Sequence, residues 1–108
     1  MSVWAFKDFV DSRGENLIRT WLEGVPKKVR VKFTSRLQYL SGQTVHQRPQ
    51  VAPLHDRKGK RCSGLYEVRI VCDGIAYRPI GYYGPGSREF TLLVGAQEKG
   101  RRLEPQAV

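Results

Sequence analysis

The sequence predicts a single α+β domain over residues 1–108, in which two N-terminal helices pack on one face of a small antiparallel sheet in the order β-α-α-β-β-β. Three observations support this prediction. Apolar residues recur at helical spacing between residues 17 and 40, and apolar and polar residues alternate over residues 65–72. The helical segments also precede the later strand-like segments and do not alternate with them, which is typical of an α+β fold.

The N-terminal half supplies one strand and two helices. Residues 3–6 (VWAF) form a short apolar run that predicts a first strand. The next apolar residues are spaced as on one face of a short helix: Leu17, Ile18, Trp21, Leu22 and Val25. A second helix is predicted to begin at Pro26, where the missing N–H costs nothing, and to end at Ser41-Gly42. Its apolar face consists of Val29, Phe33, Leu37 and Leu40.

The C-terminal half supplies three strands after an irregular segment. Residues 42–64 show no periodicity, so we expect a long loop, and such loops are often functional in compact domains. Residues 65–72 (LYEVRIVC) form a strand that leads into Asp73-Gly74, a strong two-residue hairpin turn. Residues 75–83 and 90–96 form the next two strands, and a polar, basic tail without predicted structure follows them.

The composition is strongly basic. There are 19 Lys and Arg residues against 10 Asp and Glu, which gives a net charge of +9. Such an excess attracts a polyanion or an acidic protein partner, and the alternative is a basic surface that only aids solubility.

The sequence indicates a cytoplasmic protein. No apolar stretch approaches the roughly 20 residues that a membrane helix needs, and the N-terminus does not resemble a signal peptide. We therefore expect no membrane partner, and we expect Cys62 and Cys72 to be reduced thiols. These cysteines and the histidines His46 and His55 do not match a usual zinc spacing, so no metal or cofactor is expected.

Two strand arginines are the first candidate site. A hairpin at Asp73-Gly74 places Arg69 opposite Arg78, on the sheet face away from the helices. Side-by-side guanidinium groups repel unless an acid or a bound anion lies between them. Glu67 is one such acid, and an ion pair with it is the structural alternative. The functional interpretation is a phosphate site, because the planar guanidinium donates paired hydrogen bonds to phosphate oxygens.

Further candidates surround these arginines. Lys58, Lys60 and Arg61, in the run RKGKR, are candidates to hold flanking phosphates, although such a run can also be plain solvated surface. Tyr82 and Tyr83 point to opposite faces of their strand, so one of them belongs to the core. A tyrosine on an open sheet face can stack RNA bases.

Four motifs follow one another along nearly the whole chain. They are W-x-F-K-D near the N-terminus, a basic helix after L-E-G-V-P, the strand G-L-Y-E-V-R-I, and Y-R-P-I-G-Y-Y followed by F-T-L-L-V-G-x-x-x-K. In this series the sequence resembles the RelE/HigB superfamily of bacterial toxins, in particular the phage-associated HigB-like branch.

The resemblance implies a β-α-α-β-β-β fold and a toxin of a toxin–antitoxin module. Such a toxin is a metal-independent endoribonuclease that cleaves messenger RNA, usually on the ribosome, inhibits translation and is silenced by a small antitoxin protein. By the same resemblance, Arg69 and Arg78 match arginines that stabilise the scissile phosphate, and Lys99 matches a basic residue after the last strand. Tyr82 or Tyr83 lies where some members carry a catalytic or base-stacking tyrosine.

The resemblance does not identify the general acid and base. Some relatives use a histidine near the end of the chain, and here no histidine follows His55. Two alternatives therefore stay open. One is a non-catalytic protein of the same fold that binds another protein or a nucleic acid, and the other is an inactive remnant derived from a phage.

Overall fold

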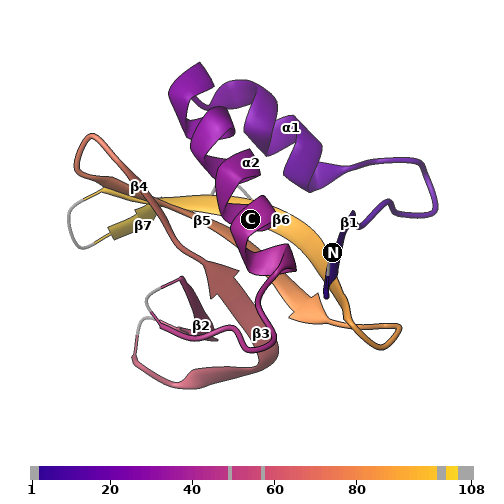
Figure 1. Cartoon of the computed structure of the whole chain (residues 1–108). Coiled ribbons are helices and arrows are strands. Elements are labelled where there is room, and N and C mark those ends of the chain that lie inside the picture. Colours follow the sequence, from indigo (N-terminus) through magenta and orange to yellow (C-terminus); the bar gives the residue numbers. More distant parts are fainter. Residues whose placement is uncertain (1–2, 49, 57, 100–101, 105–108) are drawn as a thin grey trace.

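The protein consists of two helices that lie over one face of a bent sheet (Figure 1). The computed structural model describes residues 3–48, 50–56, 58–99 and 102–104. Within these residues no helix has the length and apolar character that crossing a membrane requires.

Helix α1 (Leu17–Gly24) begins where a side chain caps it. The side-chain oxygen of Asn16 accepts a hydrogen bond from the Arg19 backbone N–H at 3.0 Å. The amide of Asn16 donates to the Asp8 carboxylate at 3.0 Å, which ties the start of the helix to the first strand. Three residues of the predicted apolar stripe, Ile18, Trp21 and Leu22, form the buried side of this helix. Val25 is buried directly after the helix, whereas Leu17, predicted to belong to the stripe, is 49% exposed.

Helix α2 (Lys27–Ser41) follows directly after Pro26, which stands at its N-cap. Its Arg30 guanidinium donates to the carbonyls of Val25 at 2.6 Å and Leu22 at 3.3 Å. These carbonyls lie at the end of α1, and the Leu22 carbonyl also accepts a hydrogen bond from the Val25 N–H at 3.4 Å. A residue of the second helix therefore helps to cap the first one.

The sheet has seven strands among the described residues. They are β1 (Ala5–Asp8), β2 (Val51–His55), β3 (Arg61–Val68), β4 (Ile70–Cys72), β5 (Ile75–Tyr83), β6 (Glu89–Lys99) and β7 (Arg102–Glu104). The main path runs β1-β6-β5-β3-β2, while β4 pairs with β5 and β7 pairs with β6. Strand β1 runs parallel to β6, and every other pair is antiparallel.

The prediction of a small antiparallel sheet with the element order β-α-α-β-β-β is wrong. Six strands follow the helices, and the β1–β6 pairing makes the sheet mixed. Strand β2 lies in the segment predicted to be a loop; it pairs only with β3, and such an edge strand tolerates Pro53 and an irregular pattern. Most of the chain separates β1 from β6, so no local pattern indicates their direction.

The hairpin at Asp73-Gly74 is confirmed. Both turn residues have positive φ, at 52° and 77°, as a type I′ turn requires. The pairs Ile70–Tyr77 and Glu67–Ile80 share the predicted register. Arg69 interrupts the predicted continuous strand: it lies between β3 and β4, and its N–H donates to the Gln50 carbonyl at 2.9 Å.

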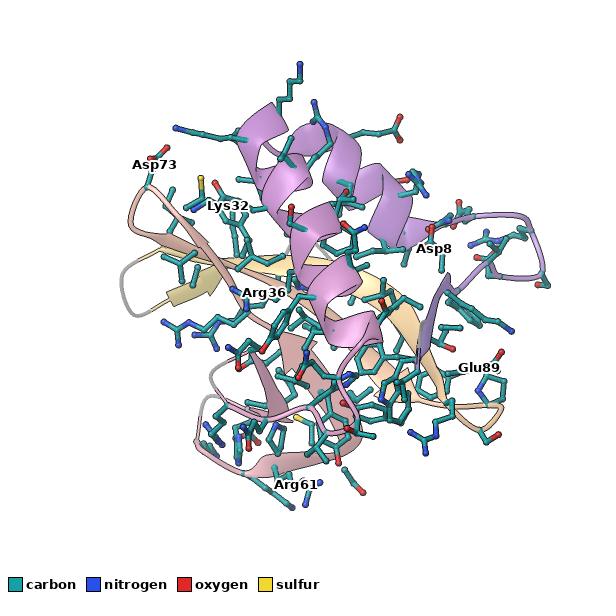
Figure 2. All side chains as sticks on the ribbon, viewed as in Figure 1. Asp8, Lys32, Arg36, Arg61, Asp73 and Glu89 are labelled. Carbon is teal, nitrogen blue, oxygen red and sulfur yellow. The ribbon has the colours of Figure 1, made fainter. Side chains whose placement is uncertain are left out.

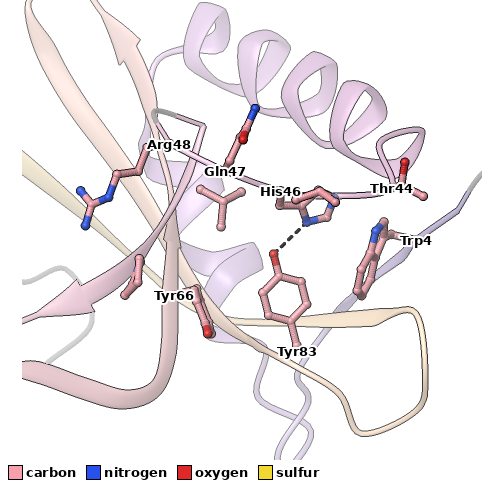
Figure 3. A pocket seen from close by; sticks show the side chains of 10 residues that line it. Trp4, Thr44, His46, Gln47, Arg48, Tyr66 and Tyr83 are labelled. Carbon is pink, nitrogen blue, oxygen red and sulfur yellow. Dashed lines mark hydrogen bonds between the residues drawn. The ribbon is translucent and has the colours of Figure 1, made fainter.

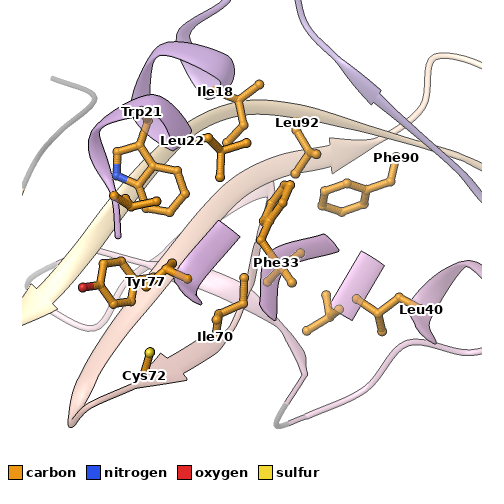
Figure 4. Packing of buried hydrophobic residues seen from close by; sticks show 14 residues of the cluster. Ile18, Trp21, Leu22, Phe33, Leu40, Ile70, Cys72, Tyr77, Phe90 and Leu92 are labelled. Atoms are coloured by element: carbon orange, nitrogen blue, oxygen red, sulfur yellow. The ribbon is translucent and has the colours of Figure 1, made fainter. Parts of the chain in front are cut away.

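The core lies between the helices and the sheet (Figure 4). It includes Ile18, Trp21, Leu22, Val29, Phe33, Leu40, Val68, Ile70, Tyr77, Phe90 and Leu92. The Trp21 indole packs directly over the backbone of Gly95 in β6. This close contact requires a residue without a side chain on the strand.

Replacing Gly95 with alanine is expected to destabilise the protein. The new Cβ would overlap the Trp21 indole, and overpacking of this kind typically costs about 1–3 kcal/mol. Urea unfolding measures the loss. Gly24→Ala is the matched control, because nothing lies within 4 Å of a Cβ at Gly24. An equal response of the two variants would contradict the tight packing at Gly95.

Candidate functional site

A cavity of about 470 Å³ opens between the α2–β2 segment and the sheet (Figure 3). We call it the aromatic cavity. Ten residues line it: Trp4, Thr44, Val45, His46, Gln47, Arg48, Val51, Pro53, Tyr66 and Tyr83. Its volume lies in the range of about 300–1,000 Å³ that is typical of small-molecule sites.

Tyr83 lies at the centre of the aromatic lining. Its ring centroid is 5.1 Å from that of Trp4, 5.0 Å from that of Tyr66 and 5.8 Å from that of His46. Phe90 packs beneath it at 4.8 Å, in an edge-to-face arrangement. These contacts hold the ring of Tyr83 in one orientation, with its hydroxyl directed to His46 (Figure 3).

Hydrogen bonds assign the tautomer of His46. Its Nε2 lies 2.7 Å from the carbonyl oxygen of Leu40, and its Nδ1 lies 2.8 Å from the Tyr83 hydroxyl oxygen. A carbonyl can only accept, so Nε2 carries a proton and donates it. In the neutral imidazole Nδ1 then accepts a hydrogen bond from the Tyr83 hydroxyl. The second lone pair of that hydroxyl oxygen stays available to a ligand.

Burial raises the pKa of the Tyr83 hydroxyl from 10.0 to about 12, with a smaller contribution from Tyr66. The hydroxyl is therefore neutral over the physiological range. It can pass a proton on, but it does not act as a preformed phenolate.

An alkaline titration is expected to show a late component that belongs to Tyr83. Its tyrosinate absorbance should rise near pH 12, and Tyr83→Phe should remove that component. Because the folded pKa is the higher one, the folded state keeps a proton that the unfolded state releases, so stability falls as pH rises from 10 to 12. A Tyr83→Phe protein with an unchanged titration curve would contradict this assignment.

Arginines surround the aromatic cavity. Arg48 lines it directly. The guanidinium carbon of Arg61 lies 5.8 Å from the Tyr66 ring centroid, and its Nη2 donates to the Tyr66 hydroxyl at 3.1 Å. The guanidinium carbon of Arg88 lies 5.7 Å from the Trp4 ring centroid. All three side chains are exposed, so they can meet an anion at the mouth of the cavity.

The two strand arginines of the sequence prediction have different surroundings. Nη1 of Arg78 donates to both carboxylate oxygens of Glu67, at 3.0 and 2.9 Å, and their side chains are only 19% and 13% exposed. The ion pair with Glu67 is therefore present. Arg69 is exposed between the buried residues Val68 and Ile70, which places its side chain on the sheet face away from the helices.

The other predicted residues are spread over the molecule. Lys58 and Lys60 are exposed at the β2–β3 connection. Their backbone N–H groups both donate to the Asp56 carboxylate. Tyr82 lies on the strand face opposite Tyr83. Lys99 ends β6, and its side chain lies outside the described residues. Arg61 lies at the end of the molecule away from Asp73 (Figure 2).

Sequence reasoning missed four members of the aromatic cavity: Trp4, His46, Arg48 and Tyr66. His46 and Arg48 belong to residues 42–64, and the length of that segment was the only signal of function. The sequence places Trp4 in the apolar run of residues 3–6 and Tyr66 in the strand of residues 65–72, and neither pattern indicates a cavity. No spacing in the sequence indicates that Trp4, which precedes β1, lies close to Tyr83 of β5 and that Tyr66 of β3 lines the same cavity.

The comparisons with known proteins give no match. The chain matches no protein family, no curated protein and no solved structure. Over the residues that the structure describes, no three His, Cys, Asp or Glu side chains are placed to hold a metal ion.

Proposed function

We propose that the protein is an endoribonuclease toxin that acts in the cytoplasm. It cleaves messenger RNA, in association with the ribosome, and inhibits translation until an antitoxin protein binds it. The proposal joins the sequence resemblance to the RelE/HigB superfamily with a basic chain of net charge +9. It rests on one observation above all, the hydrogen bond between Tyr83 and His46 inside a cavity bordered by arginines.

The dyad of Tyr83 and His46 supplies the base for the reaction. The ribose 2′-OH gives its proton to the Tyr83 hydroxyl oxygen while the Tyr83 proton moves to Nδ1 of His46. The imidazolium that forms keeps its Nε2–H hydrogen bond to the Leu40 carbonyl, which holds the ring in place. His46 thus fills the role that the resemblance left without a residue.

The bonds change in one in-line step. The 2′ oxygen forms a bond to phosphorus, and the bond from phosphorus to the 5′ oxygen breaks. The products are a 2′,3′-cyclic phosphate and a 5′-hydroxyl end, whose proton comes from solvent at the cavity mouth. Arg48 and Arg61 stabilise the additional negative charge on the phosphate, and Arg69 holds a neighbouring phosphate on the sheet. The nucleophile belongs to the substrate, so the reaction itself requires no metal or cofactor.

Expression from an inducible promoter in a bacterial cell tests the proposal. We expect growth arrest together with fragmented messenger RNA, and 5′-hydroxyl ends on the fragments. Arg69→Ala is the informative variant of the predicted arginines, because its side chain is exposed and the change should leave the fold intact. Purified protein added to ribosomes programmed with messenger RNA shows whether cleavage depends on the ribosome.

The alternatives give different outcomes. Growth arrest with intact messenger RNA would show that the protein is not a nuclease. It would then act as a non-catalytic protein that binds another protein or a nucleic acid. Neither arrest nor cleavage, in a protein shown to be folded by circular dichroism, would identify an inactive remnant.

A further inference from the structure

The aromatic cavity has the shape of a small-molecule site. It is a hollow of about 470 Å³, with walls from the α2–β2 segment, β2, β3, β5 and Trp4, which directly precedes β1. Four of its ten lining residues carry aromatic rings, counting the imidazole: Trp4, His46, Tyr66 and Tyr83. Such a lining favours a flat, aromatic ligand.

The charge around the cavity selects an anion. None of the ten lining residues is acidic, and Arg48 is one of them. Arg61 and Arg88 border the same rings through their contacts with Tyr66 and Trp4. A ligand with an aromatic ring and a phosphate can use both features at once, because the ring stacks and the guanidinium groups hold the phosphate.

Polar groups at the rim complete the site. Thr44 and Gln47 are exposed lining residues that can donate and accept hydrogen bonds. The Tyr83 hydroxyl donates a hydrogen bond to His46, so its oxygen can accept a further hydrogen bond from a ligand. These groups match the edges of a nucleobase and the hydroxyls of a ribose.

We infer that the aromatic cavity binds a single nucleotide as a free small molecule, with its base against Tyr66 and Trp4 and its phosphate on Arg48 and Arg61. The ligand class is a nucleoside monophosphate. This inference uses the cavity of the proposed function, but it does not require cleavage of RNA. In an active enzyme the bound nucleotide would compete with the substrate.

Nuclear magnetic resonance with adenosine monophosphate tests the inference. The protein has two tryptophans, Trp4 in the cavity and Trp21 in the core, and Trp4→Phe assigns their two indole N–H signals. Saturable binding should shift the Trp4 signal and leave that of Trp21 in place, with a Kd on the order of 100 μM. Adenosine alone and inorganic phosphate alone should each bind about 10-fold more weakly or worse.

Single substitutions test the base-stacking residues and the phosphate-binding residues of the cavity separately. Tyr66→Ala and Arg48→Ala should each weaken adenosine monophosphate binding about 10-fold. Arg48 is exposed at the rim, so its variant stays informative if Tyr66→Ala fails to fold. Tyr39→Ala, at an exposed position on α2, and Arg13→Ala, in an exposed ion pair, are the matched controls and should bind as the parent protein does.

The outcomes keep this inference apart from the proposed function. Binding of adenosine monophosphate without RNA cleavage would support the inference and count against the nuclease. Cleavage of RNA without saturable binding of the monophosphate would overturn the inference, while it would support the proposed nuclease function. Binding of a short oligoribonucleotide only, or an equal loss in the control variants, would also overturn it.

Discussion

Tyr83→Phe is expected to lower the rate of RNA cleavage by about 100-fold or more, which is the usual contribution of a positioned general base. The substitution removes one oxygen atom, and with it the link between the ribose 2′-OH and Nδ1 of His46. The phenylalanine ring keeps the contacts of Tyr83 with Trp4, Tyr66 and Phe90, so the fold should persist. Single-turnover cleavage of a labelled RNA measures the effect.

Two comparisons show whether the loss is chemical. Tyr39→Phe removes the hydroxyl of an exposed tyrosine on α2 and should cleave as the parent protein does. His46→Gln should also slow cleavage, because in the proposed reaction the imidazole is the proton acceptor. Full activity of Tyr83→Phe would show that Tyr83 and His46 do not act as the base in the reaction.

Glu67→Ala is expected to lower the free energy of unfolding by about 3–5 kcal/mol, because it leaves a largely buried guanidinium without its carboxylate. Arg78 Nη1 makes two hydrogen bonds to Glu67, and the pair is only 19% and 13% exposed. A small domain is stable by about 5–15 kcal/mol, so the variant should lose a large share of its stability. Urea unfolding followed by circular dichroism measures the change.

The exposed pair of Arg13 and Glu15 provides the control. Its side chains are 78% and 56% exposed, and Glu15→Ala should cost less than about 1 kcal/mol. Equal effects of Glu15→Ala and Glu67→Ala would show that the Glu67–Arg78 pair does not hold the sheet together. The same pair decides how an inactive Arg78→Ala variant is interpreted, since loss of folding alone would abolish its activity.

Local patterns predicted the helices and the central hairpin well. Most of the predicted helical faces are buried, with Leu17 exposed and Leu37 half-buried, because helical spacing determines which side chains meet the sheet. The Asp73-Gly74 turn sets the register between Ile70 and Tyr77, because few residue pairs adopt its backbone conformation. In these elements the information lies within a few residues of sequence.

The pairing of the remaining strands could not be predicted from local sequence patterns. Pairing of β1 with β6 joins residues more than 80 positions apart, such as Ala5 and Glu89, and nothing near either strand specifies the partner. The edge strand β2 contains Pro53, and its pairing with β3 is irregular between Pro53 and His55, so its sequence shows no strand periodicity. Strand pairing of this kind depends on the rest of the sheet.

The sequence by itself determined the charge of this protein, its two helices and its central hairpin. These follow from composition and from spacing along the chain, which act locally. Only the tertiary structure decided that Arg78 is held by Glu67 and that Tyr83 meets His46, 37 positions away, in a cavity that Trp4 and Tyr66 complete. Those contacts join distant segments, and the packing of the whole chain is what brings them within hydrogen-bonding distance.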